Sequence, residues 1–243
     1  MTTPPPQAAA PSRHRTETTK EGYDLIATLE AAEASPSSSA YSLTLELSSP
    51  PLTGRRTLLI VLADQSSSMR PAWHQVQSAL QYIVSEASSV PDSLIAEIIL
   101  YQTFAKRMAT GAGFDDAIMH EVAGGATCFA SAFDMCLSVI REHIDHSPPG
   151  SLDVVILFMT DGGHSTKRNA LQSYNQLREY LHSIAANTIV HTIGFTDTHL
   201  FSVLDRIRKE MGKSEGTYSY ADMSDGRLAL RRKMEGVFDV ASM

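Results

Sequence analysis

The chain has 243 residues, of which 43% are hydrophobic, and its formal net charge is -7 at pH 7. A chain of this length and composition can bury the core of one large domain. Its negative charge gives no general attraction for nucleic acid or for an anionic membrane surface, so we expect it to bind neither. No apolar stretch reaches the length that spans a bilayer, so we also expect no membrane insertion.

The first 40 residues differ in composition from the rest of the chain. Residues 1–40 are rich in Pro, Ala, Ser and Thr, and only a short helix-like apolar patch at 25–29 interrupts them. This composition predicts a mostly disordered tail. Residues 41–47 then alternate apolar and polar side chains, which is the period of a strand with one buried face. We therefore predict a domain over residues 41–243 that begins with this strand as an N-terminal extension.

From Arg56 onward, apolar strand-like runs alternate with segments of helical period. Such alternation predicts an α/β fold, doubly wound, in which helices cover both faces of a mainly parallel sheet. The pattern predicts strands over residues 58–63, 94–104, 106–110, 154–159, 188–195 and 217–220. It predicts helices from Pro71 to Ala87, from Phe129 to Asp145, and over residues 168–186, 200–211 and 225–240.

Two cysteines, Cys128 and Cys136, fall within one predicted helix. Two helical turns separate their Cα atoms by ~12 Å, which is too far for a disulfide. Free thiols are typical of a reducing compartment. Because the N-terminus also lacks the apolar core of a secretory signal, we expect an intracellular, cytoplasmic protein.

Polar side chains follow the two most apolar strands. Asp64 ends the first of them and is followed by Ser66 and Ser68, whereas Asp161 follows the strand at 154–159. Thr127 lies in a glycine-containing loop that precedes a helix. Ligands of open α/β sheets bind beyond the carboxyl ends of the strands, where the strand order reverses. We therefore expect these five residues to converge at one edge of the sheet.

The five side chains offer two carboxylates and three hydroxyls. Hard oxygen ligands of this kind suit Mg²⁺, Mn²⁺ or Ca²⁺ rather than zinc or copper. Mg²⁺ takes six ligands at ~2.1 Å, so this set leaves room for one more. An external carboxylate, from an Asp or Glu of a protein partner, would suit the open position.

Three segments carry a family resemblance. Residues 64–68, with the sequence DQSSS, resemble the D-x-S-x-S motif of von Willebrand factor type A domains, and residues 125–127 and 160–162 resemble the family's threonine loop and its T-D-G motif. The resemblance covers about residues 41–240. It implies a Rossmann-like, six-stranded, mainly parallel sheet. It also implies a metal-ion-dependent adhesion site formed by Asp64, Ser66, Ser68, Thr127 and Asp161.

One position departs from the family pattern. Ser67 stands where the family usually has glycine between the two serines. If the loop needs positive φ there, serine strains it by ~1 kcal/mol and weakens metal binding. A scaffold that binds its partners without metal is therefore an alternative hypothesis.

Several of these residues also have an alternative interpretation. Ser68 and Thr127 could cap helices, and Asp161 could be a turn aspartate. His164 could act as the general base of a metal-assisted hydrolase at the same site. However, no G-x-S-x-G elbow surrounds any serine, and no group is evident that would orient His164.

The hypothesis that joins these observations is a binding module. Mg²⁺ or Mn²⁺ would hold an acidic side chain of a protein partner, and the resemblance implies a role as an adaptor in assembling a larger complex. We predict no catalytic residue and no organic cofactor.

Overall fold

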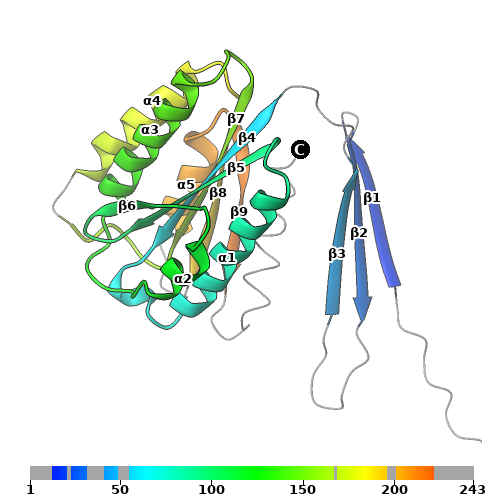
Figure 1. The fold of residues 1–243 in the computed structure, drawn as a ribbon, viewed down its shortest axis with the longest axis horizontal. Helices are drawn as coiled ribbons and strands as arrows, with labels where there is room; N and C mark the ends of the chain where they lie inside the picture. Colours follow the sequence, from blue (N-terminus) through cyan, green and yellow to red (C-terminus); the bar gives the residue numbers. More distant parts are fainter. Residues whose placement is uncertain are drawn as a thin grey trace, which may run out of the picture. The chain divides into compact units, whose positions relative to one another are not determined.

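The computed structural model describes residues 55–166, 169–195 and 201–221, together with the backbone of residues 13–20, 23–31 and 41–48. The chain divides into two units, Met1–Leu52 and Thr53–Met243. Figure 1 shows a three-stranded sheet in the first unit and an α/β sheet in the second.

The first unit contains an antiparallel sheet of three strands, in the order β1 (Arg13–Lys20), β2 (Tyr23–Ala31) and β3 (Tyr41–Ser48). The strand predicted at 41–47 is present as β3, which pairs with β2. The apolar residues of the patch at 25–29 include Leu25 and Leu29, whose register partners are Leu47 and Leu43. Their spacing therefore fits the period of a strand as well as that of a helix. The chain divides after Leu52, whereas the predicted boundary falls between residues 40 and 41, and the limits 1–40 and 41–243 stay a prediction.

The second unit is built on a sheet of six strands. Neighbouring strands are parallel except for β6, which runs antiparallel to β5. This is the doubly wound, mainly parallel six-stranded sheet that the sequence and its resemblance predict. Across the sheet, the order is β6 (Ala105–Met108), β5 (Leu94–Tyr101), β4 (Arg56–Asp64), β7 (Leu152–Thr160), β8 (Thr188–Phe195) and β9 (Ser214–Ala221).

Helices cover both faces of this sheet. Figure 1 shows α1 (Trp73–Ser89) and α2 (Phe114–Met119) on one side, with α3 (Phe129–Asp145) and α4 (Ala170–Ser183) on the other. The fifth helix, α5 (Phe201–Glu210), buries Leu204 and Ile207 in the same apolar cluster as α3 and α4. The six-residue α2 is too short to show a helical period, so the sequence did not predict it. The helix predicted over 225–240 lies outside the described residues.

The central strand β4 explains why the sheet needs two helical layers. Its side chains from Leu58 to Ala63 are all fully buried. Leu59, Val61 and Ala63 belong to the cluster beneath α1, whereas Leu58, Ile60 and Leu62 belong to the cluster beneath α3 and α4. Because neither face carries a polar side chain between Leu58 and Ala63, both must be covered by helices.

The strand order reverses at β4. Its neighbours are β5, which follows it in the chain, and β7, which comes later by a second crossover. The loops that leave β4 and β7 therefore diverge above the sheet and leave a crevice between them. Asp64, the last residue of β4, lies at this reversal point.

Both cysteines are buried and neither forms a disulfide. Cys136 lies inside α3, and Cys128 is the residue that precedes its first turn. Within the described residues, no helix combines the length and the apolar character needed to cross a membrane.

A buried carboxylate joins the edge strand of the sheet to α3 through hydrogen bonds. Glu97 of β5 accepts two hydrogen bonds from Arg107 of β6, at 2.7 and 2.5 Å, and its Oε1 lies 2.8 Å from His143 Nε2 of α3. Burial alone would raise the pKa of Glu97, but the hydrogen bonds from His143 and Arg107 outweigh it and hold the pKa below its usual value. The ionised form of Glu97 therefore stabilises the fold at neutral pH.

We predict that Glu97→Gln lowers the free energy of unfolding by about 1–3 kcal/mol at pH 7, because it removes a charged acceptor from a buried cluster. Urea denaturation measures the change. The matched control is Glu142→Gln, since Glu142 bonds the same Arg107 at 2.8 Å from an exposed position and is expected to cost less than about 1 kcal/mol. Because the pKa of Glu97 is depressed in the folded state, the difference between wild type and Glu97→Gln should shrink as the pH falls below about 4.3. Equal stability of the two proteins at pH 7 would contradict this role.

Candidate metal centre

Three loops meet at the carboxyl edge of the sheet. The backbone N–H and the hydroxyl of Ser67, in the loop after β4, both donate to the carbonyl of Gly125, at 3.1 and 3.0 Å. The loop that contains Gly125 is bonded in turn to the loop after β7, since the Ser165 N–H donates to the Thr127 carbonyl at 2.9 Å. The three segments singled out in the sequence are thus adjacent in the fold.

Asp64 is fully buried at the centre of this edge. One carboxylate oxygen accepts the backbone N–H of Ser66 at 2.8 Å, and the other accepts the hydroxyl of Thr160 at 2.7 Å. Burial raises the pKa of Asp64 to about 6, although these hydrogen bonds oppose the rise. Nearby Asp161 adds a smaller upward effect on the same pKa. Two donors and a low-dielectric surrounding fix the carboxylate in one orientation.

Ser66, Ser68 and Asp161 form a connected row of oxygens. The hydroxyls of Ser66 and Ser68 lie 3.1 Å apart, and the Ser68 hydroxyl donates to the Asp161 carboxylate at 2.9 Å. Burial raises the pKa of Asp161, and the bond from Ser68 partly offsets the rise. Ser68 lies within the 3-10 turn Ser67–Met69, and its hydroxyl bonds side chains, so it does not act as a helix cap.

Thr127 is buried at the junction of the other two loops. Its backbone N–H donates to the Ser165 hydroxyl at 2.9 Å. The residue that precedes the first turn of α3 is Cys128, so Thr127 is not the cap of that helix. Among the described residues, the Thr127 hydroxyl has no hydrogen-bond partner, and it remains available to a ligand.

One glycine is required in this arrangement, and Ser67 is tolerated. Gly125 has φ +76°, and a Cβ there would overlap the side chain of Gln102. Ser67 instead opens a right-handed 3-10 turn, a conformation of negative φ that any residue adopts. The strain that we considered at Ser67 is therefore absent, and its hydroxyl adds a bond to Gly125.

The donor set fits a small hard cation. Two ligands in adjacent positions of an octahedron with Mg²⁺–oxygen bonds of ~2.1 Å lie about 3.0 Å apart. The pairs Ser66–Ser68 and Ser68–Asp161 are separated by 3.1 and 2.9 Å. In the described part of the chain, no group of three or more His, Cys, Asp or Glu side chains could hold a metal. The site therefore depends on hydroxyls as well as carboxylates.

Both ring nitrogens of His164 contact neighbouring residues of the fold. Its Nδ1 accepts the backbone N–H of Phe129, the first residue of α3, at 3.1 Å, and its Nε2 lies 3.2 Å from the Thr166 hydroxyl. Since a backbone N–H only donates, Nδ1 carries no proton in this contact. His164 thus satisfies one of the N–H groups left open at a helix N-terminus. This contact opposes its use as the general base of a hydrolase.

Several residues position the site, although the sequence alone assigned them no such role. Thr160 orients Asp64, Ser165 joins the two outer loops, and the Gln65 side chain donates to the Val122 carbonyl at 3.1 Å. Beneath them, Tyr101 is fully buried and donates its hydroxyl to the Met159 carbonyl at 2.9 Å. The role of Thr160 could have been inferred from the sequence, because it places a hydroxyl directly after the apolar run of residues 154–159.

Solved structures resemble this chain in fold. No family model and no curated protein matches the chain. Proximal thread matrix protein 1 from the mussel byssus matches with a TM-score of 0.59 and 14% identity, over 77% of this chain and 48% of that protein. The vWF domain of the type V pili tip protein Mfa5 from Porphyromonas gingivalis matches with a TM-score of 0.52 and 12% identity, over 78% of this chain and 97% of that domain.

The chain has the von Willebrand factor type A fold. The manganese-loaded TRAP protein of Plasmodium vivax shares it with a TM-score of 0.52 and 18% identity, over 74% of this chain and 73% of that one. A further structure of the byssus protein has a zinc-occupied MIDAS motif, and it matches with a TM-score of 0.55 and 16% identity over 78% of this chain. This chain spans about half the length of the byssus protein.

We predict that Thr160→Val weakens metal binding at this edge by about 10-fold or more, since loss of a residue that orients a ligand typically costs 10–100-fold in affinity. Thr160→Ser keeps the hydroxyl that bonds Asp64 and serves as the matched control. Titration calorimetry with Mn²⁺ on both variants measures the effect. Equal affinities in the two variants would show that Thr160 does not position the site.

Proposed function

We propose that the carboxyl edge binds Mg²⁺ or Mn²⁺ and uses it to capture an acidic side chain of a protein partner. Ser66, Ser68 and Thr127 would hold the ion directly, and Asp64 and Asp161 would do so directly or through water. When bound, the ion would supply a positive centre with an open position for a carboxylate. The observation that carries the proposal is the row of oxygens from Ser66 through Ser68 to Asp161, at the spacing of octahedral ligands.

The composition of the site favours an external carboxylate as the remaining ligand. Three of the five oxygen donors are neutral hydroxyls, so the protein supplies at most two negative charges. Five donors also leave one of six positions to another molecule. A carboxylate is a hard oxygen ligand, and it would add the negative charge that the hydroxyls do not provide.

Structural neighbours support a role in attachment. They include a pilus adhesin, SpaC from Lactobacillus rhamnosus GG, with a TM-score of 0.54 and 8% identity over 93% of this chain and 33% of that one. Metal occupies the fold in the zinc and manganese structures named above. Because a fold hosts many functions, the site geometry carries the argument and these neighbours only agree with it.

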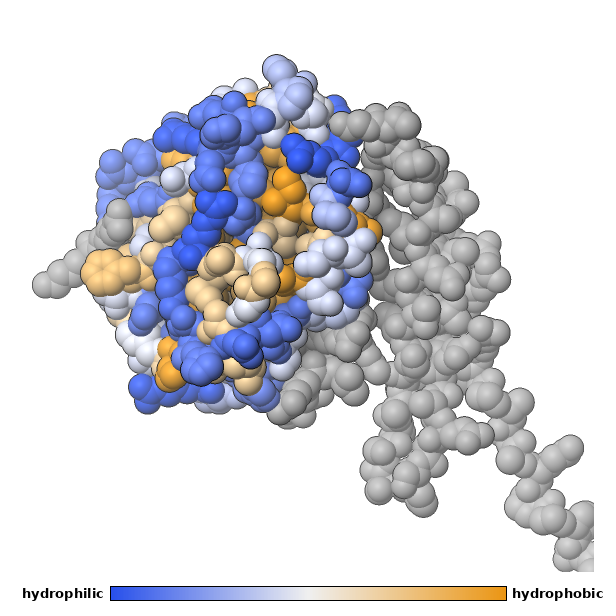
Figure 2. Space-filling model, in the orientation of Figure 1, coloured by the Kyte–Doolittle hydropathy of each residue, from blue (hydrophilic) through white to orange (hydrophobic). Residues whose placement is uncertain are grey.

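Two large apolar side chains near the site expose surface that a partner could bury. Phe104 and Val122 are 76% and 75% exposed. Phe104 lies in the turn after β5, whose last residue, Tyr101, is the register partner of Asp64. The Val122 carbonyl accepts a hydrogen bond from Gln65, the residue after Asp64. Figure 2 shows apolar side chains among hydrophilic ones on the visible face of this unit. Burial of such side chains would add affinity to a single carboxylate contact.

The proposal describes a binding module and not an enzyme. His164, the one candidate base considered, already accepts a backbone N–H of α3. We further propose that the module is an adaptor within a larger complex. The intracellular location expected from the cysteines stays a prediction.

We predict saturable, one-to-one binding of Mg²⁺ and Mn²⁺ to the chelator-stripped full-length chain in titration calorimetry. Asp64→Ala should abolish the signal, because it removes the buried carboxylate around which the loops are arranged. Ser67→Gly should leave affinity within about twofold, since Ser67 adopts a conformation open to any residue. Binding that survives Asp64→Ala would place the metal elsewhere. No binding in the wild type would favour the metal-independent scaffold.

A second prediction concerns the partner. Short random peptides displayed on phage, selected on the full-length chain in Mg²⁺ and compared with selection in EDTA, should become enriched in Asp or Glu only when Mg²⁺ is present. Synthetic peptides with that acid replaced by its amide should bind at least about tenfold more weakly. Fluorescence anisotropy measures both affinities.

The contribution of Phe104 and Val122, called the apolar rim below, can be tested with the same peptides. Phe104→Ser and Val122→Ser should weaken peptide binding while metal affinity stays unchanged. Val90→Ser is the matched control, because Val90 is also exposed but lies between α1 and the start of β5. Enrichment that persists in EDTA would contradict metal-dependent capture, and equal binding by the rim variants would exclude Phe104 and Val122 from the contact.

A further inference from the structure

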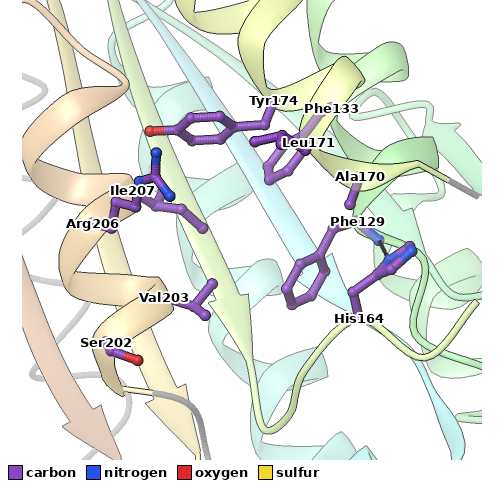
Figure 3. Close-up of a pocket in the computed structure, with 10 residues that line it drawn as sticks. All are labelled: Phe129, Phe133, His164, Ala170, Leu171, Tyr174, Ser202, Val203, Arg206 and Ile207. Atoms are coloured by element: carbon purple, nitrogen blue, oxygen red, sulfur yellow. Dashed lines mark hydrogen bonds between the residues drawn. The ribbon is translucent and has the colours of Figure 1, made fainter.

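A cavity of about 560 Å³ opens between α4 and α5, on the face of the sheet that α3 also covers. Figure 3 shows its walls: side chains from α3 and α4 lie on one side, and side chains of α5 lie on the other. The volume falls within the range of small-molecule sites. None of Asp64, Ser66, Ser68, Thr127 and Asp161 lines it, so it is separate from the candidate metal centre.

The walls are apolar and held in place by packing. Phe133 lies between its neighbours, with ring centroids 6.2 Å from Phe129 and 6.0 Å from Tyr174. All three aromatic side chains are nearly buried, and so is Ile207 on the opposite wall. By contrast, Leu171 lines the cavity and is 57% exposed. A ligand would therefore find a preformed surface and would cover an apolar side chain that now faces solvent.

One end of the cavity carries a net positive charge. The guanidinium groups of Arg178 and Arg206 lie 5.7 and 5.8 Å from the centroid of the Tyr174 ring. Arg206 lines the cavity, and its Nε donates to the carboxylate of Glu210 at 2.9 Å. Two arginines beside one glutamate leave a local charge of about +1. This charge stands out on a chain whose net charge is -7.

We propose that this cavity binds a small amphipathic carboxylate. Its flat, apolar body would lie between the aromatic wall of Phe129 and Phe133 and the α5 wall of Val203 and Ile207. Its carboxylate would face Arg206, the one arginine among the described residues that line the cavity. Guanidinium groups bind carboxylates through charge-assisted hydrogen bonds, and apolar walls with a few polar groups are typical of small-molecule sites.

The test uses 2-naphthoate and its uncharged amide, 2-naphthamide, as probes of the full-length chain. Titration followed by NMR chemical shifts should show saturable binding of naphthoate, with shifts on the residues that line the cavity. Naphthoate should bind at least about tenfold more tightly than naphthamide, because only the acid gains a charge-assisted bond to Arg206.

Two substitutions should move the affinity in opposite directions. Arg206→Gln should remove the preference for the acid over the amide, whereas Glu210→Gln should strengthen naphthoate binding because it removes a competing negative charge. Arg141→Gln is the matched control, since the Arg141 guanidinium also lies over a tyrosine ring, that of Tyr180 at 5.0 Å, but does not line the cavity. It should leave both affinities unchanged.

An uncharged variant separates loss of apolar contact from loss of charge. Leu171→Gln removes apolar contact area from the wall without changing its charge, so it should weaken naphthoate and naphthamide binding alike. The thermal unfolding temperature verifies that the variant is folded. Absence of saturable naphthoate binding, shifts confined to other surfaces, or equal affinities of the acid and the amide would each overturn the proposal. Binding should be the same in Mg²⁺ and in EDTA, so it is independent of the metal centre.

Discussion

The arrangement of the carboxyl edge depends on one constraint, the burial of the Asp64 carboxylate at the point where the strand order reverses. A buried acid is costly unless donors meet both of its oxygens. Here the Ser66 N–H and the Thr160 hydroxyl do so. The first donor requires the loop after β4 to turn back over its own strand end, and the second comes from β7. The hydrogen bonds therefore join two loops and fix the positions of Ser66, Ser68 and Asp161.

The segment from Thr160 to Thr166 serves two parts of the molecule at once. Thr160 and Asp161 face the candidate metal centre, and Ser165 joins the outer loops. His164 accepts the first N–H of α3 and also lines the cavity beside α4. The two proposed sites thus lie on either side of one short loop. Their ligands differ in kind, because hydroxyls and carboxylates suit a hard cation whereas aromatic walls and an arginine suit an organic anion.

Structural neighbours with 8–18% identity share the fold of this chain. Such similarity shows how little of the sequence the fold requires. Buried strands need apolar side chains on both faces, and many combinations of Leu, Ile and Val satisfy that need. The site is more demanding, because Gly125 and the hydroxyls each meet a specific geometric requirement.

The sequence by itself determined the fold class and most of the described elements of the second unit, because continuous apolar strands and helical periods are local patterns. It also brought Asp64, Ser66, Ser68, Thr127 and Asp161 together as candidates, since their motifs follow strand ends. It did not determine α2, which is too short to be periodic, or the pairing of β3 with β2, because pairing depends on which strands meet. Only the tertiary structure decided that Ser67 is unstrained, that His164 caps α3, and that a cavity lies beside Arg206. Each of these depends on contacts between residues far apart in the chain, which no local pattern records.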